Sequence, residues 1–319
     1  MKPVIIEKEE ILKLLDFKEI ITVIEKSFAD FSLGKSIMPQ PQDIVLEEFR
    51  GETHIKSAYV KGSASYCVKI ASGFYDNPKL GLNSSQGMMI LLNSETGMPK
   101  CILLEEGMLT DYRTAAAGAV AAKYLANANS KNVLVVGSGI QARLQVEFLR
   151  QIFQIRQVFV WGRSEENVEI YRKYFSKLDF LNVKPISAIE ECQEIDIVVT
   201  ATPSRSPLLS KVEKGVHVNA IGADMPGKQE LSPKLLAEAK IVTDSTSQCE
   251  KSGELQHALR SGDLILKDVH AELGEIVAKS KKGREYPDEI TVFDSTGLGV
   301  QDLAIANYVF EKFINQNKN

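Results

Sequence analysis

Residues 132–142 are NVLVVGSGIQA, and this stretch decides the fold of the chain. An apolar, strand-like run leads straight into Gly137-Ser138-Gly139, and a helical pattern starts at once after it. In such a βαβ unit Gly137 permits a tight turn, Gly139 lets a pyrophosphate approach the backbone, and Ala142 allows close helix packing. The helix N-terminus then presents N–H groups to the phosphates, although a purely structural turn is the alternative. The cofactor-binding residues predicted in this loop are Gly137, Ser138, Gly139, Ile140 and Gln141.

Downstream of this loop, short apolar strands alternate with helical segments, which implies right-handed crossovers and a parallel sheet covered on both faces. Upstream, an amphipathic helix at 20–31 and alternating runs at 66–70 and 88–92 indicate an α+β region. A small-residue helix at 115–122 bridges the two regions, and a last helix at 300–313 returns to the first. The expected strands of the parallel sheet are 133–136, 158–161, 195–201, 216–221, 241–244 and 291–294.

The length of 319 residues suits two domains, because single cores stop growing at about 250–300 residues. A net charge of −4, without a basic stripe, argues against nucleic acid as a partner. No apolar run approaches the roughly 20 residues of a membrane span, and Lys8-Glu9-Glu10 interrupts any signal-peptide core. Four dispersed cysteines fit reduced thiols better than a zinc or redox motif. We therefore expect a cytoplasmic protein without a membrane partner.

The end of the second expected strand bears on the choice of cofactor. In the NAD-binding version of this unit, an acidic residue about 20 residues past the loop grips the ribose hydroxyls, whereas arginine accommodates a 2′-phosphate. Here the strand at 158–161 runs into Gly162-Arg163-Ser164, with no carboxylate. Arg163 and Ser164 are therefore predicted to contact the cofactor and to favour NADP over NAD. Dual use and a solvated turn arginine are the alternatives.

Three further stretches, together with the loop, make the chain resemble the ornithine cyclodeaminase and mu-crystallin family over almost its whole length. They are LTDYRTAA at 109–116, IGADMPGKQEL at 221–231 and FDSTGLGVQD at 293–302. The resemblance implies an α/β fold, with a Rossmann-type dinucleotide-binding domain at 114–299 and an α+β substrate-binding and dimerisation domain made from 1–113 and 300–319. It also implies a homodimer. Family activities include ornithine cyclodeamination, alanine dehydrogenation and reduction of cyclic imino acids, and the fold does not choose among them.

The resemblance assigns the chemistry to three residues. Lys69 and Arg113 match the family's ligands for a substrate carboxylate, for which arginine offers a bidentate fork and lysine a point charge. Asp224 follows the strand at 216–221 and could take a proton from the substrate ammonium or activate water. Cyclodeaminase-like and alanine dehydrogenase-like members have this aspartate, whereas mu-crystallin, a ketimine reductase, does not. We predict Asp224 and Lys69 to be catalytic, although the pattern alone fits a strand lysine and an Asx turn.

Two departures from the family pattern concern the substrate. Where many members have an arginine after the first proline motif, this chain has MPQPQ at 38–42. Where many have Met-Pro, it has HIKSA at 54–58, as in a branch that includes proteins of ectoine utilisation. His54 and Lys56 alternate onto one strand face, so both are predicted to contact the substrate, and Lys56 could replace the missing arginine. A solvated Lys56 is the alternative.

Three more segments complete the predicted site. Thr200, Ala201 and Thr202 follow a sheet strand and are expected to line the cofactor, although a simple loop also explains them. Gly297 and Leu298 resemble family residues near the nicotinamide. His270-Ala271-Glu272-Leu273-Gly274-Glu275 would place metal ligands on adjacent turns of a helix. Because no further ligand set is present and the family uses none, we expect no metal.

The resulting hypothesis is an ornithine cyclodeaminase-like enzyme: bound NAD(P)+ takes a hydride from the α-carbon, ammonia leaves the iminium, and the product cyclises. Hydride return would make the cofactor catalytic. The first rival is an NADPH-dependent reductase of cyclic imines such as Δ1-pyrroline-2-carboxylate, which Arg163 supports. A simple L-alanine-type dehydrogenase and a non-catalytic cofactor-binding protein follow. The joint presence of Lys69, Arg113 and Asp224 argues against the last.

Overall fold

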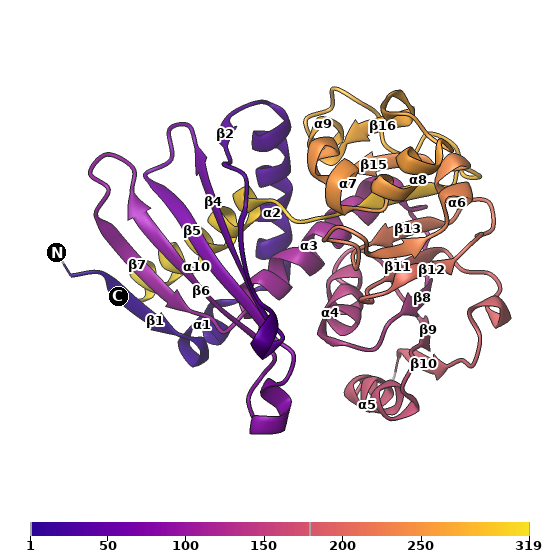
Figure 1. Cartoon of the computed structure of the whole chain (residues 1–319), viewed down its shortest axis with the longest axis horizontal. Coiled ribbons are helices and arrows are strands. Elements are labelled where there is room, and N and C mark those ends of the chain that lie inside the picture. The colour runs from indigo at the N-terminus through magenta and orange to yellow at the C-terminus, as the bar shows by residue number, and fades with distance from the viewer. Residues whose placement is uncertain (1, 179, 319) are drawn as a thin grey trace. The chain divides into compact units, whose positions relative to one another are not determined.

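The computed structural model describes residues 2–178 and 180–318, and contacts divide the chain into two compact units. Unit 1 comprises residues 1–113 and 298–319, and unit 2 comprises residues 114–297 (Figure 1). The first boundary lies inside helix α3 (Met108–Leu125), and the second lies just before helix α10 (Gly299–Gln316). Both units mix helices with sheet, as the sequence predicts.

Unit 1 is built on a seven-stranded sheet with the order β1-β7-β6-β5-β4-β2, in which β3 also pairs with β4. Only the pairing of β1 with β7 is parallel, and the other ladders are antiparallel. The strands are β1 (Val4–Glu7), β2 (Ser36–Ile37), β3 (Gln42–Leu46), β4 (Gly51–Val60), β5 (Ser65–Phe74), β6 (Ser85–Asn93) and β7 (Pro99–Leu104). The helices are α1 (Lys8–Leu14), α2 (Phe17–Ser32) and α10, with short 3-10 turns at Glu47–Phe49 and Asn77–Leu80.

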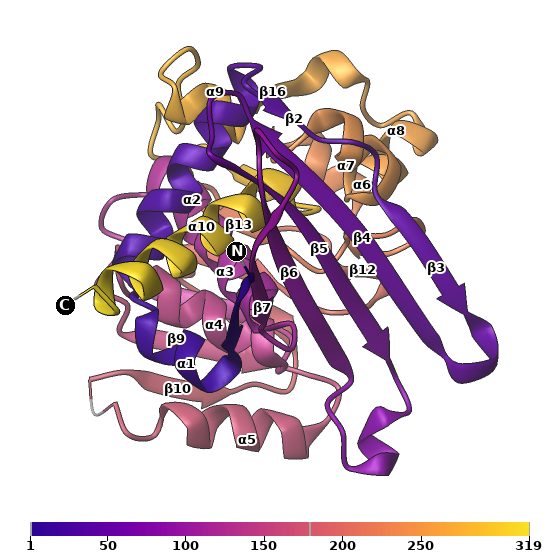
Figure 2. The same cartoon turned by 90° about the vertical axis from the view of Figure 1, so that its left-hand side faces the viewer.

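One face of this sheet is covered by α10, against which α2 packs (Figure 2). Helix α2 buries Ile20, Ile24 and Phe28, which repeat every four residues and so form one stripe. It begins earlier than the predicted residue 20 because Asp16 caps it, accepting a hydrogen bond from the Glu19 N–H at 2.9 Å. Alternation along β5 turns Cys67 and Lys69 towards the helices, so this covered face includes a lysine.

Unit 2 holds an eight-stranded sheet with the order β10-β9-β8-β11-β13-β17-β15-β16, and every pairing in it is parallel. All six strands expected from the sequence are present, and β10 and β16 extend the two edges. The strands are β8 (Asn132–Val136), β9 (Gln157–Trp161), β10 (Asn182–Pro185), β11 (Ile197–Thr200), β13 (His217–Ala220), β15 (Lys240–Thr243), β16 (Val269–Glu272) and β17 (Thr291–Asp294). A separate parallel pair joins β12 (Arg205–Leu209) to β14 (Gln229–Leu231).

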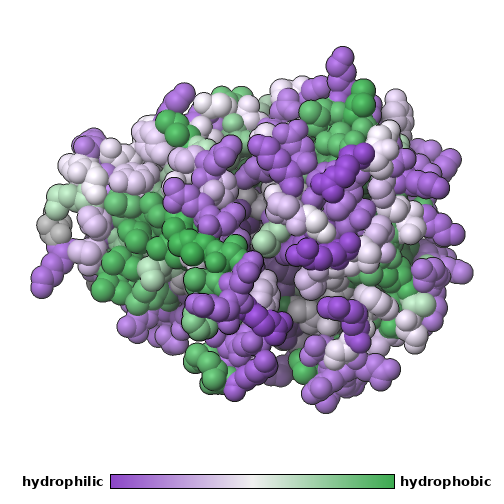
Figure 3. Space-filling view, in the orientation of Figure 1, coloured by the Kyte–Doolittle hydropathy of each residue, from purple (hydrophilic) through white to green (hydrophobic). Residues whose placement is uncertain are grey.

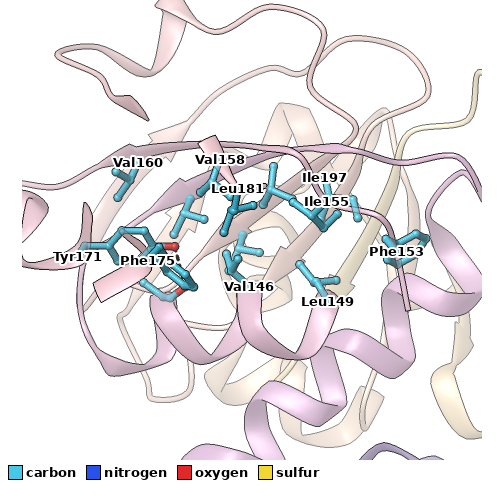
Figure 4. Packing of buried hydrophobic residues seen from close by; sticks show 14 of the residues in the cluster. Val146, Leu149, Phe153, Ile155, Val158, Val160, Tyr171, Phe175, Leu181 and Ile197 are labelled. Atoms are coloured by element: carbon cyan, nitrogen blue, oxygen red, sulfur yellow. Dashed lines mark hydrogen bonds between the residues drawn. The ribbon is translucent and has the colours of Figure 1, made fainter. Parts of the chain in front are cut away.

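The helices of unit 2 are α4 (Ile140–Leu149), α5 (Glu165–Phe175), α6 (Pro233–Ala237), α7 (Thr246–Ser252), α8 (Leu255–Ser261) and α9 (Leu273–Val277), with 3-10 turns at Ile189–Glu191 and Leu266–Asp268. Apolar side chains of α4 and α5 pack on the strands beneath them (Figure 4). Buried Tyr171 donates a hydrogen bond from its hydroxyl to the Ala142 carbonyl at 3.2 Å, which ties α5 to the start of α4. This core fixes the helix that follows the glycine loop.

The strand order places a crevice at the carboxyl edge of the sheet. From β8 the chain proceeds outward to β9 and β10, whereas β11 and β13 lie on the other side of β8. The loops after β8 and β11 therefore diverge at a topological switch point, where open α/β sheets bind ligands.

One local prediction is wrong. His270 and Glu272 lie in strand β16, not on adjacent turns of a helix, because residues 269–272 pair with β15. Helix α9 starts only at Leu273, after a capping box in which Glu275 accepts the Glu272 N–H at 2.9 Å. No group of three or more potential metal ligands occurs within residues 2–178 and 180–318. In that same part of the chain, no helix is long and apolar enough to cross a membrane.

Candidate functional site

The glycine loop after β8 begins at Gly137, a position that only glycine can occupy. Gly137 has φ +126°, and a Cβ atom there would lie 2.6 Å from the carbonyl oxygen of Ala201, in the loop after β11. Its own N–H donates to the Trp161 carbonyl at 2.8 Å, at the end of β9. The first glycine therefore lets the ends of β8, β9 and β11 come together.

Gly139 has the opposite surroundings. It is the N-cap of α4 and provides no side-chain cap, and a Cβ atom placed on it would meet nothing within 4 Å. Between the two glycines, Ser138 packs on Gly162, whose Cβ would lie 2.9 Å from the serine Oγ. The space next to Gly139 is open and lies at a helix N-terminus without a side-chain cap. Such a space suits the phosphates of a dinucleotide. The predicted loop residues thus form one cradle in which Ile140 begins the helix.

The end of β9 carries no carboxylate at 161–164, as the sequence shows. Arg163 is exposed, and Ser164 caps α5 by accepting the Asn167 N–H at 3.3 Å. The exposed guanidinium is free to turn towards a ribose phosphate. The serine already has a structural role as a helix cap.

The loop after β11 is held by a carboxylate that the sequence did not single out. Glu230, fully buried, accepts the Thr202 N–H at 2.6 Å and the Thr202 hydroxyl at 2.7 Å. Its other oxygen accepts the Gly222 N–H at 2.8 Å, at the end of β13. Burial raises the pKa of Glu230, and these hydrogen bonds oppose the rise. Thr200 therefore ends β11, and Ala201 and Thr202 begin a loop with a fixed shape beside the glycine cradle.

The segment that ends with Gly297 is fixed in the same way. Asp244, fully buried at the end of β15, accepts the N–H groups of Thr296 at 2.7 Å and Gly297 at 2.6 Å. Asp294 accepts the N–H groups of Glu254 and Leu255, both at 3.0 Å, and burial raises its pKa to about 7. Leu298 belongs to unit 1, where it caps α10.

Asp224, the predicted proton-transfer residue, lies in the turn after β13 and is half exposed. One carboxylate oxygen accepts a hydrogen bond from Lys228 Nζ at 2.6 Å. The turn closes through a hydrogen bond from the Lys228 N–H to the Met225 carbonyl at 3.2 Å, and Gly227 provides its positive φ of +81°. About half of this side chain is exposed, so solvent reaches the carboxylate.

Unit 1 contains a candidate group of its own, a buried ionic cluster on the covered face of its sheet. Lys69 Nζ on β5 lies 3.0 Å from one oxygen of Asp302, and Arg113 Nε on α3 lies 2.9 Å from the other. Lys69 is only 2% exposed and Asp302 only 1%. Register places Lys56 on β4 directly opposite Lys69, so the three predicted cations lie together. Gln301 accepts hydrogen bonds from Arg113 at 3.4 Å and from the Leu298 N–H at 3.0 Å.

The charges in this cluster explain how it would respond to an anion. Burial, with the nearby charges of Arg113 and Lys56, lowers the pKa of Lys69 to about 8, although Asp302 opposes the shift. Burial alone would raise the pKa of Asp302, yet the adjacent cations hold it below its usual value. Three cations face one carboxylate, which leaves the cluster able to hold a substrate carboxylate.

Asp302 is the main residue that sequence reasoning missed. It lies within the stretch 293–302 already singled out, but its function could not be assigned there. The signal available was an acidic residue in the first turn of the last helix, on the side that the apolar pattern predicts to be buried. His54, by contrast, pairs with Asp43 at 2.6 Å and lies 3.8 Å from Glu52, so its ring is held at the edge formed by β3 and β4.

Comparison with known proteins shows which proteins the whole chain resembles. Residues 1–317 match the model of the ornithine cyclodeaminase/mu-crystallin family. Alanine dehydrogenase of Archaeoglobus fulgidus is 39% identical over 99% of this chain and 97% of its own. The structure of an archaeal alanine dehydrogenase dimer with bound NAD has a TM-score of 0.92 at 38% identity, covering 99% of this chain and 98% of that one. Thermococcus litoralis Δ1-pyrroline-2-carboxylate reductase, in complex with NADH and L-proline, has a TM-score of 0.91 at 31% identity and covers 98% of both chains.

The contrast between the two loop glycines can be tested. Gly139→Ala should keep the free energy of unfolding within about 0.5 kcal/mol, because its Cβ meets open space. The same methyl group would occupy the phosphate space, so the Kd for NADH should rise about tenfold or more. Urea unfolding and fluorescence titration with NADH measure the two effects. Gly137→Ala should instead lose stability, and an unchanged Kd in Gly139→Ala would remove the phosphate assignment.

The role of Asp302 can be tested through stability. Asp302→Asn should lower the free energy of unfolding by about 3–5 kcal/mol, because it leaves two buried cations without their partner. The pKa of Asp302 is lowered in the fold, so its contribution is complete above the unfolded value of about 3.9 and is lost as pH falls through the folded one. Urea unfolding from pH 7 down to pH 3 checks both statements.

Asp76→Asn provides the matched control, because Asp76 forms exposed ion pairs with Arg50 and Lys79. Its cost should be small beside that of Asp302→Asn, because solvent screens exposed ion pairs. Equal losses in the two variants would contradict the buried-cluster interpretation.

Proposed function

Because the chain belongs to the ornithine cyclodeaminase/mu-crystallin family, we propose that it transfers a hydride between NAD(P) and the α-carbon of a small L-amino acid or its imine. It is an NAD(P)-dependent enzyme of amino or imino acids, like its named relatives. The observation that carries the proposal is the buried cluster of Lys69, Arg113 and Asp302. A substrate with an α-carboxylate would bind there; the Thermococcus litoralis relative is described in complex with L-proline, which carries such a group.

The cluster suits an α-carboxylate for two reasons. Asp302 orients both cations, so that a carboxylate meets preformed donors instead of flexible side chains. Arg113 also offers NH groups in a planar fork, of which Nε is already used by Asp302. Lys69 and Arg113 would thereby hold the α-carbon in place for hydride transfer.

The residues of unit 2 would hold the cofactor and manage protons. The glycine cradle and the loop fixed by Glu230 would bind the pyrophosphate, and the segment fixed by Asp244 would lie near the nicotinamide. The nicotinamide ring supplies or accepts the hydride. Asp224, open to solvent, would accept the proton that the substrate ammonium loses and return it in the reverse direction. Oxidation thus yields an imino acid, reduced cofactor and one proton.

Among the specific activities we favour net oxidation or reduction, in which the cofactor is released in its other redox state. Relatives above 30% identity include an alanine dehydrogenase, Δ1-pyrroline-2-carboxylate reductases and an iminosuccinate reductase, together with an uncharacterized cyclodeaminase of Sinorhizobium fredii. Cyclodeamination without net change of cofactor is the second candidate. It is favoured by Asp224, whose solvent-open carboxylate could activate the water or amine that attacks the iminium carbon. Exposed Arg163, with no carboxylate at 161–164, supports use of NADP as well as NAD.

A homodimer is supported by the outer face of the unit 1 sheet, which α10 leaves uncovered. Figure 3 shows a hydrophobic area over this sheet. The apolar side chains that alternate onto this face are Val68, Ile70, Met88, Ile90, Leu92, Ile102 and Leu104. A continuous apolar face of this kind typically pairs with a partner, and one neighbouring structure is described as a dimer.

Three assays distinguish the activities. We expect L-alanine with NAD+, or Δ1-pyrroline-2-carboxylate with NADPH or NADH, to give a continuous absorbance change of the nicotinamide. L-ornithine with NAD+ is the third mixture, in which ammonia without net NADH would establish cyclodeamination instead. Cofactor binding without turnover of any amino or imino acid would refute the proposed enzyme and leave a binding protein.

Asp224→Asn should lower turnover by about 10²–10⁴-fold, because the amide cannot carry the proton, while the Kd for NADH stays the same. Steady-state kinetics and NADH titration measure the two. Lys228→Gln removes the ion-pair partner and keeps the carboxylate, so it should retain most activity. Equal losses in both variants would indicate that only the ion pair matters.

A further inference from the structure

Glu105 is a buried carboxyl group that the proposed mechanism does not use. It lies between the end of β7 and the start of α3 and is fully buried. One oxygen, Oε2, accepts the Leu109 N–H at 2.6 Å. The other, Oε1, is buried without a hydrogen-bond partner within residues 2–178 and 180–318. A carboxyl with one unsatisfied oxygen is costly to keep ionised, so its position calls for a reason.

The backbone makes room for this carboxyl. A Cβ atom on Gly87 of β6 would lie 2.5 Å from Glu105 Oε1, so only glycine lets the side chain rest against the strand. The Glu106 N–H donates to the Gly87 carbonyl at 3.0 Å, and Gly107 takes a φ of +83° immediately before α3 begins. The segment is therefore shaped to bury the carboxyl of Glu105 and to expose that of Glu106, which pairs with Lys8 at 2.6 Å.

Glu105 faces the buried ionic cluster. Its charge is felt by Lys69 and Cys67 on β5 and by Asp302 on α10, and Arg113 and Lys56 complete that cluster. The Cys67 thiol is neutral, because burial raises its pKa. Among the groups at most 5% exposed, Lys69 and Arg113 carry two positive charges, and Asp302 and ionised Glu105 carry two negative ones. The fully buried groups are thus balanced only while Glu105 is ionised, and the partly exposed Lys56 adds a positive charge that solvent screens in part.

A bound substrate carboxylate upsets that balance. It adds a third negative charge among the fully buried groups, and the cost of staying ionised is highest for the carboxyl that has no cation in contact. Asp302 lies 3.0 and 2.9 Å from two cations, whereas Glu105 is held by the backbone N–H groups of Leu109 and Gly107. Protonation of Glu105 therefore restores neutrality at the least cost.

Resting on the proposed function, we propose that Glu105 takes up a proton from solvent when a substrate carboxylate binds beside Lys69 and Arg113, and releases it on dissociation. Burial raises the pKa of Glu105 to about 7, although the Leu109 N–H and Lys69 oppose the rise, so both states are accessible near neutrality. Carboxylate affinity then falls as pH rises above that value, by up to about tenfold per pH unit for one coupled proton.

The experiment measures protons taken up on binding. Pyrrole-2-carboxylate is a suitable probe, because it carries the carboxylate but neither reacts nor titrates on its ring near neutrality. It is titrated into the NADH-saturated protein by calorimetry at pH 7.0, in buffers of different ionisation enthalpy. We expect about half a proton per ligand, because Glu105 is about half ionised there. Pyrrole-2-carboxamide, which lacks the charge, should give no uptake.

Three variants assign the proton. Glu105→Gln should remove most of the uptake, whereas Glu106→Gln, at the exposed neighbour, should keep it. Lys69→Arg keeps a permanent charge, so uptake that persists there comes from Glu105. Uptake that survives Glu105→Gln and disappears in Lys69→Arg would overturn the proposal and assign the proton to Lys69, whose pKa is lowered to about 8.

A second measurement does not depend on how well a variant folds. Infrared difference spectra of the wild-type protein should gain the carbonyl band of a protonated carboxyl group when pyrrole-2-carboxylate binds, and absence of that band would refute the proposal. Turnover of amino or imino acids without this band or proton uptake would leave the proposed function intact. No binding of pyrrole-2-carboxylate and no turnover would overturn both.

Discussion

Asp302 lies between Lys69 and Arg113, at 3.0 and 2.9 Å, where almost no solvent reaches. Burying either cation without a partner on the covered face of the sheet would cost much free energy, and the carboxylate offsets this desolvation cost. The same pairing orients both cations. The substrate-binding chemistry that we propose for unit 1 therefore depends on one residue from the last helix reaching two residues from the first third of the chain.

Unit 2 uses buried carboxylates for a different purpose. Glu230, Asp244, Glu254 and Asp294 are fully buried acceptors of backbone N–H groups. Glu230 and Asp244 hold the loops after β11 and β17, Glu254 accepts N–H groups of β14, and Asp294 accepts those at the start of α8. Loops in which irregular backbone is satisfied in this way lose the freedom that exposed loops have. A cofactor would then meet segments already shaped to receive it, which reduces the ordering cost of binding.

Features that depend on neighbouring residues were predicted from the sequence more fully than features that depend on distant segments. The βαβ pattern around Gly137 correctly predicted the six central strands of a parallel sheet, because alternating apolar strands and helices have few other solutions. The edge strands β10 and β16 were missed, since the short segments Asn182–Pro185 and Val269–Glu272 carry little apolar signal. His270 and Glu272 were placed on a helix because their spacing suits one, and pairing with β15 overrode it.

The sequence by itself determined the glycine cradle, because its requirements are local: a strand, a positive φ at Gly137, an open N-cap at Gly139 and a helix follow one another directly in the chain. The resemblance to the family singled out Lys69, Arg113 and Asp224 as candidate site residues. Only the tertiary structure decided that Lys69 and Arg113 share Asp302, and that Glu105 is buried beside them with one oxygen unsatisfied. Charge balance and desolvation depend on which segments pack together, and the sequence pattern of a single segment does not contain this information.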